Sequence, residues 1–181
     1  MHCDLIALPH NLGYTVFERL CAMKTPRVYI ETSVFNFVFT DDAPEKKQDA
    51  LKFFAEIKAG LYEPFTSQYA IDELSDAPEE KRRKMLNLLT DYRIKLIETS
   101  DDAVRLADLY VAEGVIPLKY RTDALHIAIA SVMELDFVVS YNFRHIVKRK
   151  TIVLSGAINQ REGLRQIAIF SPTEVIESDD E

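Results

Sequence analysis

The chain has 181 residues, of which 48% are hydrophobic, which is enough to bury the core of one domain. Its net charge of −7 argues against a broad nucleic-acid-binding surface but permits a small basic rim around an acidic cleft. No apolar run approaches the ~20 residues that span a bilayer, and the N-terminus lacks the pattern of a secretory signal. Cys3 and Cys21 show no metal-ligand spacing. We therefore expect a cytoplasmic protein with no membrane partner.

The first part of the chain differs from the rest. Residues 1–24 show no clear periodicity, so we expect an extension, poorly ordered or packed at the periphery, before a single domain over residues 25–181. Met23 is then an alternative start of translation. An ordinary helix around Tyr14–Leu20 is an equally weighted alternative.

From Arg27 onward, short apolar strands alternate with helices. Val28–Glu31 is β-branched and aromatic, as expected of a buried strand. Ser33 is expected to cap a short helix over Val34–Phe39, and Pro44 opens a helix that Gly60 ends. The further expected strands cover residues 65–67, 93–97, 137–140 and 166–170. The further expected helices cover residues 68–74, 79–92, 101–113 and 122–133, with a short one opened by Pro172.

Strands that are apolar on both faces and separated by helices indicate a parallel sheet that is covered on both sides. The expected fold class is therefore α/β, a three-layer domain with a central, mostly parallel sheet and helices on both faces. No internal repeat or low-complexity linker divides it.

Polar side chains gather where the expected strands end. Glu31 follows the first strand, Asn142 follows the strand ending at Ser140, and Glu73 lies about one turn into the helix after the second strand. Asp123 opens a helix that is otherwise almost wholly apolar. Ligands bind outside the carboxyl ends of such strands, so we expect these four side chains to share one cleft. Their oxygen ligands favour Mg²⁺ or Mn²⁺, and a cation would offset their mutual repulsion.

Each of these residues also has a purely structural interpretation. Asp123 could only cap its helix, Glu73 could be solvated, and Asn142 could only form a turn. Glu31 could form an ion pair with a nearby Lys or Arg, since a carboxylate that ends a buried strand needs a partner. His126 is expected to be a core histidine bonded to a backbone carbonyl rather than a metal ligand.

Four segments resemble the successive motifs of the PIN-domain family. They are Val28-Tyr29-Ile30-Glu31-Thr32-Ser33, Ser67–Glu73, Asp123-Ala124-Leu125-His126-Ile127-Ala128 and Ser140-Tyr141-Asn142-Phe143-Arg144-His145. The resemblance spans about residues 27–176. It implies a PIN-like fold and a metal-dependent ribonuclease. Many members are dimeric toxins of toxin–antitoxin pairs, so it also implies RNA as substrate, a homodimer and an antitoxin partner.

The resemblance assigns Glu31, Glu73, Asp123 and Asn142 to the four acidic positions of the family's site. Glu31 stands where the family more usually has Asp, and Asn142 keeps an oxygen but removes a charge. Glu31 and Asp123 are expected to hold the ion that activates a water. Glu73 is expected to orient the water or help bind a second ion, and Asn142 to position ligands through its amide.

Contacts to the substrate are expected at the rim of the cleft. The candidates are Ser33, Lys119, Arg121 and Arg144, His145 is expected at the same rim, and Tyr141 or Phe143 could stack on a base. Two other functions stay open at this point. One is a catalytically weak PIN-like module that binds RNA or protein. The other is a metal-dependent phosphohydrolase that acts on small phosphate esters.

Overall fold

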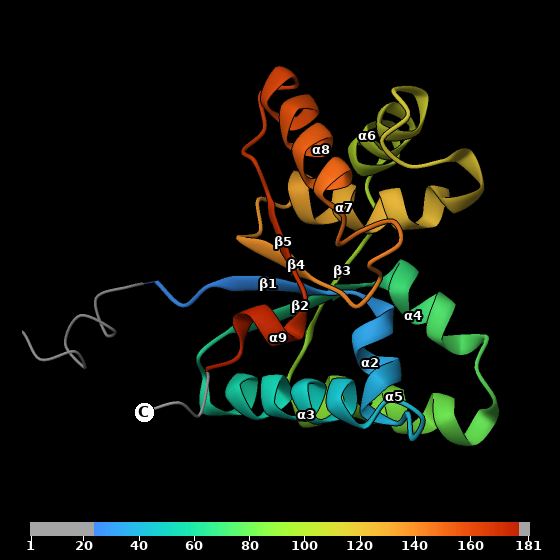
Figure 1. Ribbon diagram of the computed structural model, residues 1–181, viewed down its shortest axis with the longest axis vertical. Coiled ribbons are helices and arrows are strands. Elements are labelled where there is room, and N and C mark those ends of the chain that lie inside the picture. Colours follow the sequence, from blue (N-terminus) through green and yellow to red (C-terminus); the bar gives the residue numbers. More distant parts are fainter. Residues whose placement is uncertain (1–23, 178–181) are drawn as a thin grey trace, which may run out of the picture.

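The computed structural model describes residues 24–177, and these form one parallel sheet with helices on both sides (Figure 1). The strand order is β3-β2-β1-β4-β5, and every neighbouring pair is parallel. The strands are β1 (Arg27–Ile30), β2 (Glu63–Ser67), β3 (Lys95–Ile97), β4 (Phe137–Val139) and β5 (Ala168–Phe170). The expected three-layer α/β class is confirmed, and the sheet is wholly rather than mostly parallel.

The helices form two layers (Figure 1). One layer holds α6 (Asp101–Ala112), α7 (Arg121–Val132) and α8 (Arg149–Arg161). The other holds α2 (Thr32–Val38), α3 (Pro44–Ala59), α5 (Glu79–Asp91) and α9 (Pro172–Val175). α4 (Gln68–Ser75) follows β2, and a 3₁₀ turn (Leu118–Tyr120) leads into α7.

The central strand β1 contributes to both halves of the core. Tyr29 packs into the half under α6 and α7, while Val28 and Ile30 pack into the half that contains Phe53 and Phe54 of α3. All three β1 side chains are fully buried. This is the result of an apolar strand whose successive side chains point to opposite faces of a covered sheet.

Local signals fix several helix ends, and those of α3 agree with the expectation. Pro44 begins α3, and Gly60 ends it in the left-handed region at φ 87°. Ser100 caps α6 by accepting a hydrogen bond from the Ala103 amide at 3.2 Å. Ser67 caps α4 in the same way, with the Ala70 amide at 3.1 Å.

The expected start of one helix was wrong, and another helix was missed. α2 begins at Thr32 directly after Glu31, so Ser33 lies inside the helix and does not cap it. α8 was not expected at all. Of the expected extension over residues 1–24, only Lys24 is described. The alternative start at Met23 and both cysteines lie outside the described residues. No helix of the described part is long and apolar enough to cross a membrane.

Candidate acidic site

Glu31 lies at the carboxyl end of β1 and is buried, with 4% of its surface exposed. Its carboxylate accepts hydrogen bonds from the hydroxyls of Thr32, Ser33 and Ser140, the last at 2.7 Å. No Lys or Arg within residues 24–177 forms an ion pair with it, so the ion-pair alternative does not describe this residue. Three hydroxyl donors stabilise the buried negative charge instead.

Asp123 lies in the first turn of α7, as the sequence predicts. Burial raises its pKa to about 6; the hydrogen bond with Asn142 opposes this shift, and the charge of Glu31 adds to it. Asn142 also accepts a hydrogen bond from the His145 amide through Oδ1 at 3.0 Å, which fixes the orientation of its side chain. The charge of Glu73 also raises the pKa of Asp123, so Glu31, Glu73, Asp123 and Asn142 belong to one electrostatic group.

Glu73 is half-buried on α4 and contacts His126 of α7. Its Oε2 atom lies 2.8 Å from Nε2 of His126. On the other side of the ring, Nδ1 lies 2.8 Å from the Tyr29 hydroxyl, which in turn bonds to Ser67. His126 is buried as expected, but the expected bond to a backbone carbonyl was wrong: its partners are a carboxylate and a phenol.

The surroundings of His126 act on its pKa in opposite directions. Burial of the imidazole lowers the pKa, whereas the hydrogen bond to Glu73 and the nearby carboxylates raise it, and the net shift is upward. Burial of Tyr29 raises the pKa of its hydroxyl far above the usual value, so this group stays protonated. The chain of hydrogen bonds from Ser67 to Glu73 therefore links β2, β1, α7 and α4.

The donors of the site suit a hard cation, and Glu73 shares one of its carboxylate oxygens with His126. Across residues 24–177, no group of three or more His, Cys, Asp or Glu side chains is gathered closely enough to hold a metal ion. Glu31 and Asp123 form a two-carboxylate set, and Asn142 adds an amide oxygen. Oxygen donors of this kind fit Mg²⁺ or Mn²⁺.

The four expected substrate contacts have different environments. Ser33 bonds to Glu31 and accepts from the Tyr141 amide at 2.8 Å, so its hydroxyl is committed within the site. Arg121 pairs with Asp108 on α6 through its Nε atom. Lys119 and Arg144 are exposed and form no ion pair among the described residues. These two cations are therefore free to contact a phosphate.

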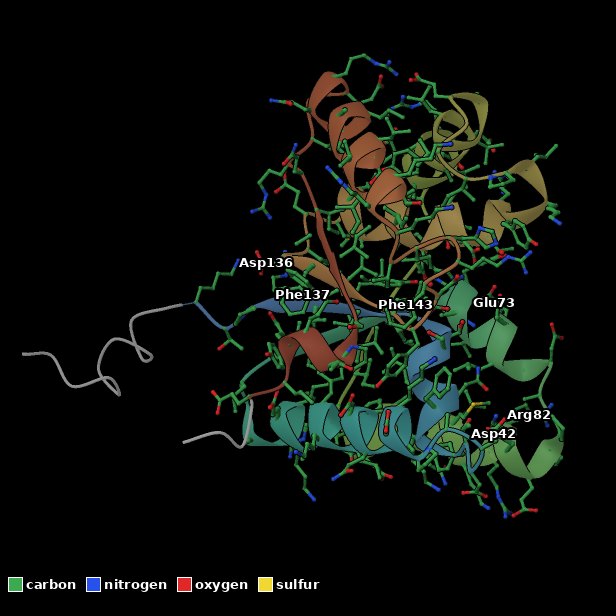
Figure 2. All side chains as sticks on the ribbon, in the orientation of Figure 1. Asp42, Glu73, Arg82, Asp136, Phe137 and Phe143 are labelled. Carbon is green, nitrogen blue, oxygen red and sulfur yellow. The ribbon has the colours of Figure 1, made fainter. Side chains whose placement is uncertain are left out.

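The two aromatic residues beside Asn142 also differ. Tyr141 is buried, and its hydroxyl donates to the Lys46 carbonyl at 2.8 Å. Phe143 is 48% exposed. Figure 2 shows Phe143 and Glu73 at the end of the sheet where α2 and α4 begin, whereas Asp136 and Phe137 lie at the opposite end. Of the two, Phe143 is the one that a base could reach.

Sequence reasoning missed three parts of this region: Ser140 as a donor to Glu31, the Tyr29–His126 link, and a stacked pair formed by Tyr120 and His145. The rings of that pair have centroids 3.8 Å apart. Ser140 ends a strand beside β1, so strand order alone would have indicated it. The Tyr120–His145 pair carries no signal in the sequence, because its members come from separate segments of the chain.

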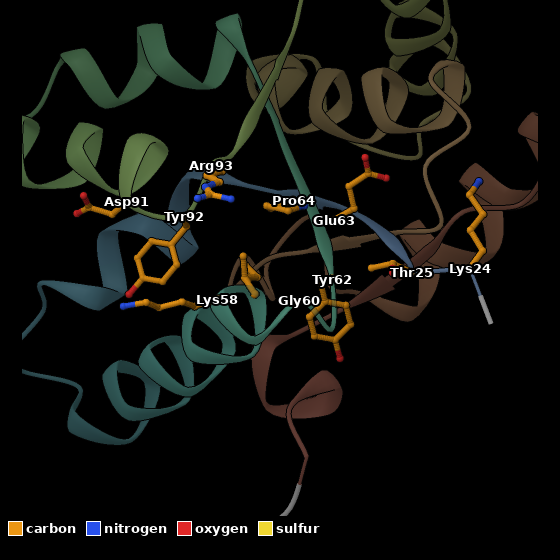
Figure 3. A pocket seen from close by; sticks show the side chains of 11 residues that line it. Lys24, Thr25, Lys58, Gly60, Tyr62, Glu63, Pro64, Asp91, Tyr92 and Arg93 are labelled. Carbon is orange, nitrogen blue, oxygen red and sulfur yellow. The ribbon is translucent and has the colours of Figure 1, made fainter. Parts of the chain in front are cut away.

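A hollow of about 760 Å³ is drawn in Figure 3, and none of the four predicted site residues lines it. It is lined by residues from the start of β2, the end of α3 and the segment after α5, among them Lys58, Tyr62, Tyr92 and Arg93. This is the amino end of the parallel strands, whereas Glu31 and Asn142 follow the carboxyl ends of β1 and β4. The hollow is thus separate from the acidic site.

The similarity of this chain to known proteins is low. No family model matches the chain, and no curated protein matches it. A chain in the crystal structure of VapBC2 from Rickettsia felis bound to a DNA fragment from their promoter is similar, with a TM-score of 0.48 and 12% identity. The alignment covers 80% of the present chain and 98% of that chain. Function therefore has to be inferred from the residues of the site.

Proposed function

We propose that this chain is a metal-dependent endoribonuclease of the PIN type that hydrolyses phosphodiester bonds in RNA. One observation carries the proposal. Glu31 and Asp123, from different elements, place their carboxylates at the carboxyl end of the sheet, and no Lys or Arg of residues 24–177 pairs with either. The order of the four motifs along the chain supports the same class.

Glu31 and Asp123 would hold Mg²⁺ or Mn²⁺, with Asn142 as an oxygen donor beside them. When bound, the ion would lower the pKa of a water molecule and withdraw charge from a phosphoryl oxygen. Other residues of the chain would orient the two carboxylates. Hydrogen bonds from Thr32, Ser33 and Ser140 orient the Glu31 carboxylate, and the Asn142 amide orients Asp123.

Substrate binding would involve Lys119 and Arg144, which lie on either side of Asp123 and Asn142 in sequence and have no acidic partner in the described chain. Phosphate contacts by such cations fix the register of a nucleic acid without reading its sequence. A toxin that is held by an antitoxin and acts as a homodimer is the biological setting that the motif resemblance favours.

Two observations favour a second candidate, a catalytically weak PIN-like module that binds RNA or protein. Glu73 is bonded to His126, and Asn142 removes a charge from the fourth position. With one acid engaged by a histidine and another replaced by an amide, the site would bind a divalent cation weakly. Measured metal affinity and turnover decide between the two candidates.

The test combines metal binding with cleavage. Mn²⁺ should raise the melting temperature of the wild-type protein, because an ion that binds only the folded state stabilises it, by about 2.7 kcal/mol at 100 times its Kd. Glu31→Gln and Asp123→Asn should remove that shift and the cleavage of single-stranded RNA. Asp91→Asn, an exposed acid beside the far hollow, is the matched control and should change neither.

Each contrary result has a definite meaning. A wild-type protein that shows no shift at millimolar Mn²⁺ and leaves RNA intact contradicts the nuclease proposal. RNA binding without cleavage would then support the weak module. Hydrolysis of p-nitrophenyl phosphate without cleavage of RNA would support a phosphohydrolase of small esters.

A further inference from the structure

Two rings and two cations gather just before α7. The Tyr120 ring stacks on His145, with an angle of 29° between the ring planes. Lys119 Nζ lies 4.7 Å from the centroid of Tyr120, and Arg144 Cζ lies 5.7 Å from it. Both cations are close enough to the ring to be attracted by its π-electrons. We call these four residues the stacked clamp.

The stacked clamp is joined to the acidic site at two points. Tyr120 directly precedes α7 and lies three residues before Asp123, so the rigid start of the helix connects them. His145 donates its backbone N–H to Oδ1 of Asn142. Asn142, in turn, bonds to Asp123. A group bound at the stacked clamp would therefore lie next to the carboxylates at a fixed position.

The cations of the stacked clamp differ from most other basic side chains near α7 because aromatic rings, not carboxylates, hold them. Arg121 and Arg161 are neutralised by Asp108 and Glu113. Lys119 instead lies over the Tyr120 ring, and its proximity lowers the pKa of the Tyr120 hydroxyl. Within residues 24–177 neither Lys119 nor Arg144 has an acidic partner. Two preorganised positive charges without counter-charges favour a polyanion as ligand.

We propose that Tyr120 and His145 are positioning residues that hold Lys119 and Arg144 as a clamp for backbone phosphates of single-stranded RNA beside Asp123. This inference rests on the proposed function, because it names a phosphate subsite of the same site. A flat aromatic pair limits the freedom of two long side chains. Less conformational entropy is then lost when each cation contacts a phosphate.

Salt dependence of RNA binding provides the test. A fluorescein-labelled single-stranded RNA is titrated with the full chain in EDTA over a range of KCl concentrations, so that no cleavage occurs. On a single strand, each phosphate that the protein neutralises adds about 0.7 to the steepness of log K against log salt. Lys119→Ala/Arg144→Ala should therefore reduce the slope by about 1.4. Lys24→Ala/Lys58→Ala, which removes the same charge beside the far hollow, should leave it unchanged.

Two variants at Tyr120 separate positioning from a general loss of structure. Tyr120→Leu should reduce the slope and the affinity toward the values of the clamp double variant, because the cations lose the ring that holds them. Tyr120→Phe keeps the ring and should restore most of the slope. The melting temperatures of the two Tyr120 variants are measured alongside. If Tyr120→Leu does not fold, the slopes of Tyr120→Phe and of the clamp double variant decide the outcome.

The stacked clamp is overturned if the wild-type chain does not bind RNA in EDTA, or if the clamp and control double variants share one slope. It is also overturned if a polyglutamate of equal charge competes as well as RNA, since the site would then bind an acidic protein. These results are independent of cleavage. If the protein does not cleave RNA but its salt slope depends on Lys119 and Arg144, the nuclease proposal is wrong and the clamp proposal stands. An active one should show a higher KM with kcat little changed in the clamp variant.

Discussion

Glu73 and His126 join two helices across the candidate site, with 2.8 Å between Oε2 and Nε2. His126 is 1% exposed, so this contact takes place at the edge of the core rather than in solvent. The same ring bonds to Tyr29 through its other nitrogen. The pair thus ties the position of a candidate catalytic acid to the packing of the central strand.

Replacing His126 with Leu should destabilise the fold, because it leaves the buried Tyr29 hydroxyl without one partner and removes the partner of Glu73. An unsatisfied buried polar group costs about 1–3 kcal/mol. Urea denaturation in EDTA measures this loss. Tyr29→Phe should also destabilise the fold, because it leaves Nδ1 of the buried His126 without its partner.

The double variant Tyr29→Phe/His126→Leu should be less destabilised than the sum of the two single variants. Residues that share a hydrogen bond typically couple by about 0.5–3 kcal/mol. Additive losses would show that the two residues act independently and would contradict the linked network.

The ionisation of Asp123 should make the protein less stable as pH rises. Burial raises its pKa from 3.8 to about 6, so the folded state holds the proton more tightly than the unfolded state. The stability that protonation provides is fully present below pH 4 and is lost as pH rises through about 6. Asp123→Asn removes this pH-dependent contribution to stability. In EDTA the variant should therefore melt above the wild type at pH 7.5, with the difference shrinking toward pH 4.

Asp91→Asn again serves as the control, because Asp91 is exposed beside the far hollow. Its melting temperature relative to the wild type should stay constant over the same pH range. A constant difference for Asp123→Asn as well would mean that Asp123 titrates normally in the folded protein.

Asn142→Asp tests the missing fourth charge with a side chain of nearly the same shape. The variant keeps an oxygen that can accept from the His145 amide, but it replaces the amide donor to Asp123 with a second negative charge. The melting temperature in EDTA at pH 7.5 should fall, since like charges repel. Mn²⁺ should then stabilise the variant more than it stabilises the wild type. A smaller Mn²⁺ shift would show that Asn142 lies outside the metal's reach.

Most elements of the fold were predictable because their signals are local. Pro44 and Gly60 fix the ends of α3, and Ser100 marks the start of α6. α8 was not predicted because some of the side chains that it buries are polar. Its buried face therefore does not form an apolar stripe in the sequence. These polar residues are Thr151, Ser155 and Asn159.

The site was predictable up to the point where long-range packing decides orientation. A parallel sheet places the ends of β1 and β4 together, which brings Glu31 near Asn142 from topology alone. That Glu73 bonds to His126 depends on how α4 packs against α7, with a sequence separation of 53 between the two. No motif spacing carries that information. Whether these residues bind metal and cleave RNA stays a prediction.

The polar face of α8 leads to a last prediction. Asn159 donates to Ser131 of α7 at 2.9 Å and accepts from the Tyr110 hydroxyl of α6, so three helices share one buried amide. Burial raises the pKa of Tyr110 to about 12, so its hydroxyl stays a donor at any ordinary pH. Asn159→Leu would leave both hydroxyls short of a partner and should cost about 1–3 kcal/mol in urea denaturation. Tyr110→Phe takes the donor away from the buried Oδ1 of Asn159 and should also destabilise the protein, and an unchanged stability would contradict a shared network. Neither change touches the acidic site, so Mn²⁺ binding should persist in both variants.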